Sequence, residues 1–341
     1  MKNRFLIVSA GAAALILLAS GVSSADGNSA SPSGQENQQN QQNQQNQQNQ
    51  QDGQKYWGTP TREIAGDGDQ QNYDQSQGAI PGVAVSGARV FSFKGGATTP
   101  VKAPTVNLLL NHGGPTLSAP NIYAIWWGPT ASFPAGYNSG ITGYLSNSAC
   151  ISGACTGLSA LVNQYYIAPT KTALTYSGTY TDTSTPPSSA PTTSSILLEA
   201  YKVVVTMNKG KMDPKGIYLV YTTNFPSKVA YCGWHGAGSV NAAPFTVSYL
   251  PNLTGVAGCA ATYLPSYVSS TNTLGVDSVV NVTSHELYET VTDPQLNAWY
   301  DSTGQEIGDK CAWTTSTKVV AGKTFTIQQE WSNIAKACAS S

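Results

Sequence analysis

Charged side chains are scarce in this sequence of 341 residues. Only 17 residues are Lys or Arg and 18 are Asp or Glu, 10% of the chain, whereas an ordinary soluble domain carries about 25%. The formal net charge is -1. A chain without a basic surface has no means of attracting a polyanion, which excludes a nucleic-acid partner. Solubility must come from Ser, Thr, Asn, Gln and Gly, a composition that favours an exported or wall-associated protein.

Motifs of several enzyme and metal classes are also missing. No Cys-x-x-Cys occurs, so a thiolate zinc site or a thioredoxin-like redox pair has no support. The folded part lacks Gly-x-Ser-x-Gly and any Gly-rich phosphate loop, which disfavours serine hydrolases and P-loop enzymes. All three Met residues precede residue 277, so no Met-turn of the metzincin kind follows the helix predicted there.

Apolar runs of membrane-spanning length are absent after the N-terminus. Residues 1–25 are typical of a signal peptide: Lys2 and Arg4 precede the apolar stretch from Phe5 to Leu18, and small residues end at Ala25. That stretch is shorter than the roughly 20 residues that a spanning helix needs. We expect cleavage near Ala25, secretion to the extracellular space or the periplasm, and no membrane contact afterwards.

The segment after the leader differs sharply from the rest. Residues 26–79 are polar, with an Asn-Gln-Gln repeat from Asn37 to Gln50. Such a segment buries too little surface to offset its ordering entropy, which predicts a disordered spacer. Residues 80–341 then form one globular domain, for which we expect a monomer.

Six cysteines in an exported chain predict disulfides. Six allow 15 pairings, and proximity favours joining neighbours in the sequence. The expected pairs are Cys150 with Cys155, Cys232 with Cys259, and Cys311 with Cys338.

Strand-like and helix-like patterns alternate along the domain. Aromatic and β-branched runs predict strands at 121–128, 173–181, 216–223 and 243–250. Helical spacing of apolar residues predicts helices at 157–166, 194–206 and 277–293. This order predicts an α/β or α+β domain with a mixed β-sheet flanked by helices.

The last of these helices carries the chemistry. In DSVVNVTSHELYETVTDP, Asp277 or Ser278 would cap the start and Pro294 would mark the end. His285 and Glu289 lie four residues apart and share a helix face. His-Glu-x-x-Glu is the arrangement of zinc peptidase helices with the second histidine replaced by a carboxylate.

Acidic residues gather in and after this helix. Seven of the eleven in 80–341 fall in the 33 residues from Asp277 to Asp309, with no Lys or Arg between Lys228 and Lys310. Burying an unpaired carboxylate costs several kcal/mol, so the cluster is either solvated or compensated by a cation. Interleaved apolar residues favour a packed segment and therefore a cation.

The expected ligands are His285, Glu289 and Asp309. Asp301 and Glu306 offer alternatives to Asp309, which we prefer because Gly308 permits close approach of the backbone. With one nitrogen and several oxygens, Zn²⁺ is the first choice, while Mn²⁺ and Ca²⁺ remain open.

Two further residues have catalytic interpretations. Glu286 would be the general base that acts on water at the ion. His235 would polarise a substrate carbonyl or supply a further ligand, although its Gly-rich surroundings predict a turn that an imidazole could simply stabilise. Trp234 beside it would suit a carbohydrate or peptide platform, as would Trp126 and Trp127 in a wall or sugar binder.

Four segments in order resemble a known family. HGGPTL (112–117), NIYAIWWGP (121–129), YCGWHGAG (231–238) and VDSVVNVTSHELYETVTDP (276–294) are similar to the EXORDIUM-like, phosphate-induced proteins of plant cell walls, in a microbial version. The resemblance spans roughly 112–311. It implies secretion, disulfides and an extracellular role in growth or wall biology, without established catalysis. Plant members generally lack the His-Glu pair at the helix.

Two functions follow. The first is a secreted, zincin-like, metal-dependent hydrolase acting on peptide bonds or a cell-wall polymer. The alternative is a non-catalytic extracellular protein of the EXORDIUM-like kind with a structural ion or none.

Overall fold

The computed structural model describes residues 82–92, 107–148, 157–166, 173–268, 272–320 and 322–341. The predicted signal peptide, the predicted spacer, residues 80–81 and the pairing of Cys150 with Cys155 lie outside these ranges.

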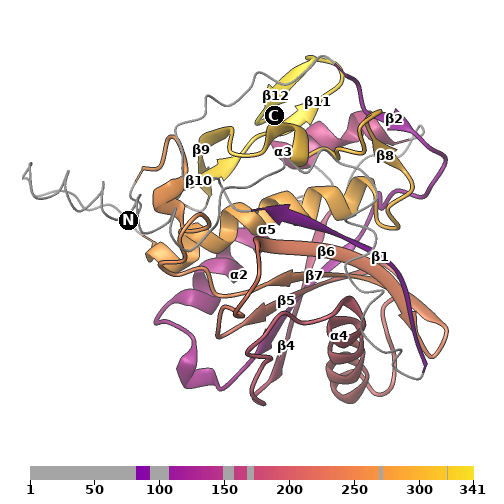
Figure 1. Ribbon diagram of the computed structural model, residues 1–341, viewed down its shortest axis with the longest axis vertical. Helices are drawn as coiled ribbons and strands as arrows, with labels where there is room; N and C mark the ends of the chain where they lie inside the picture. Colours follow the sequence, from indigo (N-terminus) through magenta and orange to yellow (C-terminus); the bar gives the residue numbers. More distant parts are fainter. Residues whose placement is uncertain (1–81, 93–106, 149–156, 167–172, 269–271, 321) are drawn as a thin grey trace, which may run out of the picture. The chain divides into compact units, whose positions relative to one another are not determined.

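A six-stranded mixed sheet forms the centre of the described part (Figure 1). In spatial order its strands are β1 (Val83–Ser92), β6 (Tyr231–Val240), β7 (Ala243–Leu250), β5 (Gly216–Thr222), β3 (Asn121–Trp127) and β4 (Thr175–Asp182). The last four are parallel to one another, whereas β6 is antiparallel to both of its neighbours. The predicted mixed sheet flanked by helices is confirmed.

Helices cover both faces of the sheet (Figure 1). α4 (Thr193–Met207) packs on one face, and α5 (Leu274–Thr292) on the other with α2 (Tyr137–Ser148) and the short α3 (Leu158–Leu161). Two hydrophobic cores result, one on each side of the sheet. Single turns of 3-10 helix lie at Thr130–Ser132, Val162–Tyr165, Ala261–Tyr263 and Asp309–Cys311.

Local sequence explains these elements. β5 is buried along its whole length, as a central strand with helices on both faces requires, and it consists mostly of β-branched, aromatic and leucine side chains. α4 begins after Thr192, whose hydroxyl accepts the N–H of Ser195. Its apolar stripe, Ile196, Ala200 and Val203 among others, faces the sheet.

Small strand pairs surround α5 on the side away from the sheet. They are β9 (Thr315–Val320) with β10 (Lys323–Gln328), β11 (Glu330–Ser332) with β12 (Ala337–Ala339), and β2 (Leu110–Asn111) with β8 (Trp299–Tyr300). β10 packs directly on α5 (Figure 1). Every residue from Gly275 to Thr292 is therefore buried, including polar positions that the sequence pattern would place at a surface.

The predicted cap of α5, Asp277 or Ser278, is wrong by four or five residues. The helix begins at Leu274, and its cap is Thr273, whose side chain accepts the N–H of Val276. Asp277 instead accepts hydrogen bonds from Tyr267 and Asn272, inside the first turn. The Ser278 hydroxyl donates to Leu274 O.

The segment YCGWHGAG is a strand, and its prediction as a turn is wrong. It forms β6, the second strand of the sheet. Its glycines permit close packing: a Cβ on Gly238 would lie 2.2 Å from Ala84 O in β1 and 2.6 Å from Leu197 Cδ1 in α4. His235 therefore has a rigid strand position rather than a turn position.

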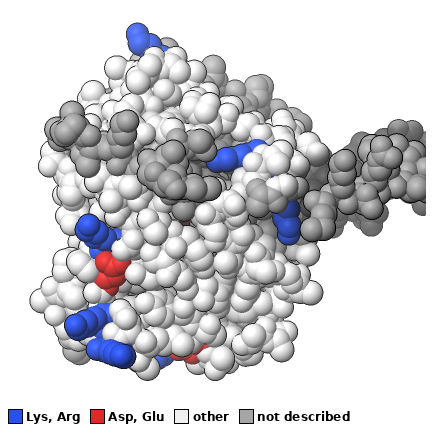
Figure 2. All heavy atoms as spheres, turned by 180° about the vertical axis from the view of Figure 1, so that it is seen from behind, with Lys and Arg blue, Asp and Glu red and all other residues white. Residues whose placement is uncertain are grey.

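Two of the predicted disulfides are confirmed. Cys232 pairs with Cys259 and Cys311 pairs with Cys338, joining β6 to the segment before α5 and the 309–311 turn to β12. No helix among the described ranges is long and apolar enough to cross a membrane. Charged side chains are sparse on the face shown in Figure 2, as the composition predicts.

Candidate metal centre

Three structural elements bring histidines and carboxylates together inside the domain. α5 supplies His285, Glu286 and Glu289, and β6 supplies His235. The chain after β8 supplies Glu306 and Asp309. Together these residues form the Glu289 cluster: His235, His285, Glu286, Glu289, Glu306 and Asp309.

The three ligands predicted from the sequence do come together. His285 Nε2 lies 3.1 Å from Glu289 Oε1 and 3.9 Å from Asp309 Oδ1. The Asp309 N–H also donates to Glu289 Oε1 at 3.1 Å. The Asp309 side chain is 20% exposed, whereas those of His285 and Glu289 are buried. This half of the cluster therefore reaches the protein surface through Asp309.

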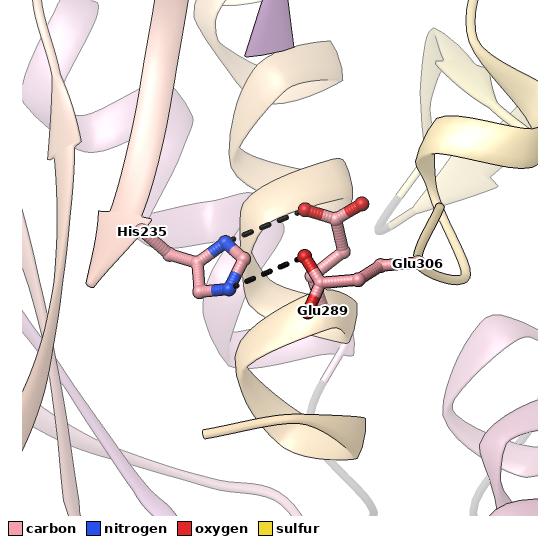
Figure 3. A group of neighbouring side chains, drawn as sticks. All are labelled: His235, Glu289 and Glu306. Carbon is pink, nitrogen blue, oxygen red and sulfur yellow. Dashed lines mark ion pairs between the residues drawn. The ribbon is translucent and has the colours of Figure 1, made fainter. Parts of the chain in front are cut away.

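The two residues predicted to be catalytic contact one another. His235 Nδ1 lies 3.0 Å from Glu286 Oε2, and it lies 3.3 Å from Glu289 Oε2. On the other side of the ring, His235 Nε2 lies 3.7 Å from Glu306 Oε2 (Figure 3). His235, Glu289 and Glu306 form a second group of possible metal ligands beside the predicted one, and Glu289 belongs to both.

Neighbours that the sequence did not indicate hold the His285 ring. Gln328 Nε2 lies 2.9 Å from His285 Nδ1 and donates to Gly308 O at 2.8 Å, while the Phe91 ring lies 4.3 Å from the imidazole. A Cβ on Gly308 would lie 2.5 Å from His285 Nδ1 and 2.9 Å from Glu289 Oε1. The close approach that made Gly308 attractive in the sequence is present.

Burial and the attraction between opposite charges shift the pKa values of the cluster residues, and the two histidines and Glu289 are held in their charged forms. Burial alone would lower the pKa of His285, but the charges of Glu289, Glu286 and Asp309 raise it to about 10. The pKa of His235 is also raised, by Glu306, Glu286 and Glu289 against the effect of burial. Burial opposes ionisation of Glu289, but the two histidines outweigh it and hold the pKa of Glu289 below its usual value. Glu289 is thus the carboxylate that remains ionised.

The other carboxyl groups of the cluster are harder to ionise. Burial raises the pKa of Glu286, and it raises the pKa of Glu306 strongly although His235 and Arg89 oppose this. Burial and the charge of Glu289 raise the pKa of Asp309 to about 7. Without a further cation, the nearby positive side chains stabilise the ionised form of Glu289 enough to outweigh burial, but not that of the other three carboxyl groups.

Two positive side chains, one next to the acidic segment and one distant in the sequence, compensate part of it, which corrects the inference that nothing nearby neutralises it. Lys310 Nζ lies 2.8 Å from Asp301 Oδ2, so Asp301 is paired and is not a ligand candidate. Arg89 Nε, on β1, lies 3.6 Å from Glu306 Oε2.

Two other acidic residues serve the local fold. Asp293 Oδ1 accepts the backbone N–H groups of Asn297 and Ala298 just after α5, and Asp277 is bonded near the helix start. Of the seven acidic residues in the segment, four remain in the cluster.

Several buried atoms of the cluster have no hydrogen-bond partner. They are both oxygens of Glu306, Oε1 of Glu286, Nε2 of His235 and Nε2 of His285. Leaving a buried polar group unsatisfied costs about 1–3 kcal/mol, more for a charged group. Such an arrangement is costly unless protons or a cation fill the space between these atoms.

The spacing of these atoms suits a cation. Two ligand atoms of one Zn²⁺ ion can be no farther apart than twice the length of the metal–ligand bond, about 4.2 Å. The separations of 3.1, 3.3, 3.7 and 3.9 Å in the cluster fall within that limit, and the two longest exceed a normal hydrogen bond.

The predicted aromatic platform is wrong. Trp126, Trp127 and Trp234 are buried, so none presents a face to a sugar. His112 is exposed and outside the cluster; its ring stacks on Tyr300 at 3.6 Å.

Comparison with known proteins gives no relatives: no family model, no curated protein and no solved structure matches this chain.

Proposed function

We propose that this chain is a secreted, metal-dependent hydrolase with a zincin-like arrangement, whose ion is held by His285, Glu289 and Asp309. The observation that carries the proposal is the approach of His285 Nε2 to Glu289 and Asp309 at 3.1 and 3.9 Å, with Glu286 adjacent on the same helix. Zn²⁺ is the preferred ion for one nitrogen and two carboxylates, with Mn²⁺ and Ca²⁺ as alternatives. The resemblance to EXORDIUM-like proteins supports the secreted location within this proposal.

Ligation through Nε2 has a structural consequence at Gln328. An imidazole that binds through Nε2 carries its proton on Nδ1 and needs an acceptor there. Gln328 now presents its amide nitrogen to Nδ1 and donates to Gly308 O. We expect ion binding to turn this amide over, so that its oxygen accepts the Nδ1–H, and its hydrogen bonds with Gly308 O and with the Trp313 N–H are lost.

Glu286 has the arrangement of a general base. One of its oxygens is held by His235 at 3.0 Å, and the other has no hydrogen-bond partner and is free to accept a proton from water. Burial raises the pKa of Glu286, which makes it a stronger base than an exposed carboxylate.

The hydrolytic step balances with these groups. Glu286 takes one proton from water as the water oxygen forms a bond to the carbonyl carbon, and it returns that proton to the amine as the C–N bond breaks. The ion would supply polarisation of the carbonyl and of the attacking water.

A second candidate function has one observation in its favour. Apart from Asp309, the cluster is buried, and structural metal sites are closed whereas catalytic sites keep an open position. On this interpretation the protein is a non-catalytic extracellular protein of the EXORDIUM-like kind in which the ion stabilises the fold.

A Glu286→Gln variant separates the two functions. Gln preserves the shape of the side chain and an oxygen that can accept from His235, but it cannot take up the proton. We expect turnover of a quenched fluorogenic peptide library by the wild type, loss of at least 100-fold in the variant, and unchanged metal content by elemental analysis. The matched control is Glu199→Gln, a buried Glu on α4 at the opposite face of the sheet.

The outcomes differ clearly. Equal turnover by the Glu286 variant and the wild type would refute the assignment of the base. Wild-type protein that contains metal but cleaves neither peptides nor isolated cell-wall polymers would support the structural ion.

A further inference from the structure

Glu289 lies between the two imidazoles of the cluster. Its Oε1 is 3.1 Å from His285 Nε2, and its Oε2 is 3.3 Å from His235 Nδ1. Asp309 also lies beside His285, and Glu286 and Glu306 lie beside His235. A single carboxylate that turns one oxygen toward each of two ligand groups has the arrangement of a bridging ligand.

The group on the His235 side has its own unsatisfied ligand. Glu306 is fully buried, and neither of its oxygens has a hydrogen-bond partner. It points toward the His235 ring from the chain segment opposite β6 (Figure 3), at 3.7 Å from Nε2. A buried acid directed at an imidazole nitrogen without a hydrogen bond leaves room for an ion between them.

His235 has the hydrogen bonding that a metal-binding histidine needs. Such histidines usually donate their second ring N–H to a carboxylate, which fixes the tautomer. Glu286 Oε2, at 3.0 Å from Nδ1, can accept that proton. The lone pair then lies on Nε2, which has no hydrogen-bond partner and faces Glu306. Because Glu289 Oε2 lies 3.3 Å from Nδ1, the Glu289 carboxylate would turn toward Nε2 to share the ion bound there.

The size of this group suits a divalent ion. Ligand atoms of His235, Glu289 and Glu306 lie within 4.8 Å of one another. They are thus no farther apart than two ligands of one ion whose bonds are about 2.4 Å long, as in larger oxygen-preferring ions. Carboxylate-rich sets suit Mn²⁺ among the transition metals.

Charge balance also accommodates two divalent ions. Arg89 is the positive side chain near Glu306, at 3.6 Å, and its NH1 donates to Gly304 O. Another buried acid, Glu330 on β11, interacts electrostatically with His285 and Glu289. Asp293 is also buried and interacts electrostatically with Glu306 and Arg89. Arg89 against these six carboxylates leaves five negative charges, which two divalent ions reduce to one; the carboxylates are Glu286, Glu289, Asp293, Glu306, Asp309 and Glu330.

We propose that the protein binds a second divalent ion through His235, Glu289 and Glu306, so that Glu289 bridges two ions. The proposal rests on the proposed function, since the first ion is the one assigned there to His285 and Asp309. It deepens that function by placing the site in the class of two-metal hydrolytic centres, in which ions about 3.5–4 Å apart act on one substrate group.

The test uses the full mature chain. Chelator-treated protein is dialysed against Mn²⁺ alone, bound metal is measured by elemental analysis, and electron paramagnetic resonance reports whether the ions are exchange-coupled. We expect two Mn²⁺ per chain and a coupled spectrum. Glu306→Gln should reduce this to one ion with the spectrum of isolated Mn²⁺, whereas Glu199→Gln should retain two coupled ions.

The result separates the two proposals. One uncoupled ion per wild-type chain would overturn the second site and leave the first intact. No bound ion in a folded chain, checked by circular dichroism, would overturn both. Two ions without coupling would overturn the bridge formed by Glu289.

Discussion

Removal of the ion should lower the thermal stability of the protein by a predictable amount. A ligand that binds only the folded state stabilises it by RT ln(1 + [L]/Kd), about 2.7 kcal/mol at 100 times Kd and about 4.1 kcal/mol at 1,000 times Kd. For a domain of 150–250 residues, each kcal/mol corresponds to about 2–4 °C in Tm. Excess chelator should therefore lower Tm by about 5–16 °C in differential scanning calorimetry.

The Glu289→Gln variant tests whether this response belongs to the cluster. Glu289 contacts both His235 and His285, so its loss removes a ligand from either possible metal group. Its Tm should not change with chelator, whereas Glu199→Gln should respond as the wild type does. A wild-type Tm that is indifferent to chelator, or an equal response in the Glu289 variant, would refute the reasoning.

Two further predictions concern pH and the disulfides. The metal-free protein should lose stability as pH rises from about 4 to 7, because the pKa of Asp309 is raised from 3.8 to about 7 and the folded state favours its protonated form. The pKa of His285 is raised from 6.5 to about 10, so His285 should lower the stability further as pH rises above 6.5. Metal ligands must be deprotonated, so the chelator-induced change in Tm should be larger at pH 8 than at pH 5, and an equal change at both values would contradict the assignment of Asp309. Each described disulfide joins cysteines 27 residues apart, for which the chain-entropy model gives a stabilisation of about 3.5 kcal/mol. Replacing either pair with Ser should therefore lower the midpoint of unfolding in urea by a similar amount. Only loss of Cys311–Cys338, which holds the turn containing Asp309, should also weaken metal affinity in calorimetric titration, and equal weakening by both replacements would argue against a local role for that turn.

The parts of the site that could be predicted from sequence depend on short-range geometry. His285 and Glu289 are four residues apart on a helix, a spacing that fixes their common face before any packing is known. Asp309 follows within one loop, and Gly308 marks the close approach that the structure shows. Strand patterns such as β5 were likewise recognisable, because burial on both faces leaves a continuous apolar run.

The remaining parts depend on tertiary pairing, which local patterns do not encode. β6 carries too many glycines to show a strand pattern, so the position of His235 beside Glu286 was not predictable. Its glycines have a reason only in three dimensions, where β1 and α4 approach the strand closely. Arg89 reaches Glu306 and Gln328 reaches His285 from segments distant in the chain, and nothing in their own sequence contexts marks them.

Burial of α5 shows the same limit. Its sequence suggested one apolar face and one polar face, but the strand pairs after residue 314 cover the polar side as well. Covering that side removes the carboxylates from water and makes their compensation the central physical problem of the fold.

Elemental analysis of the mature protein, purified without added metal or chelator, tests the central claim most directly. The account predicts at least one tightly held divalent ion per chain in the wild type and in Glu199→Gln, and its loss in Glu289→Gln. A folded wild-type protein without any bound ion, which also takes up none from solution, would contradict it.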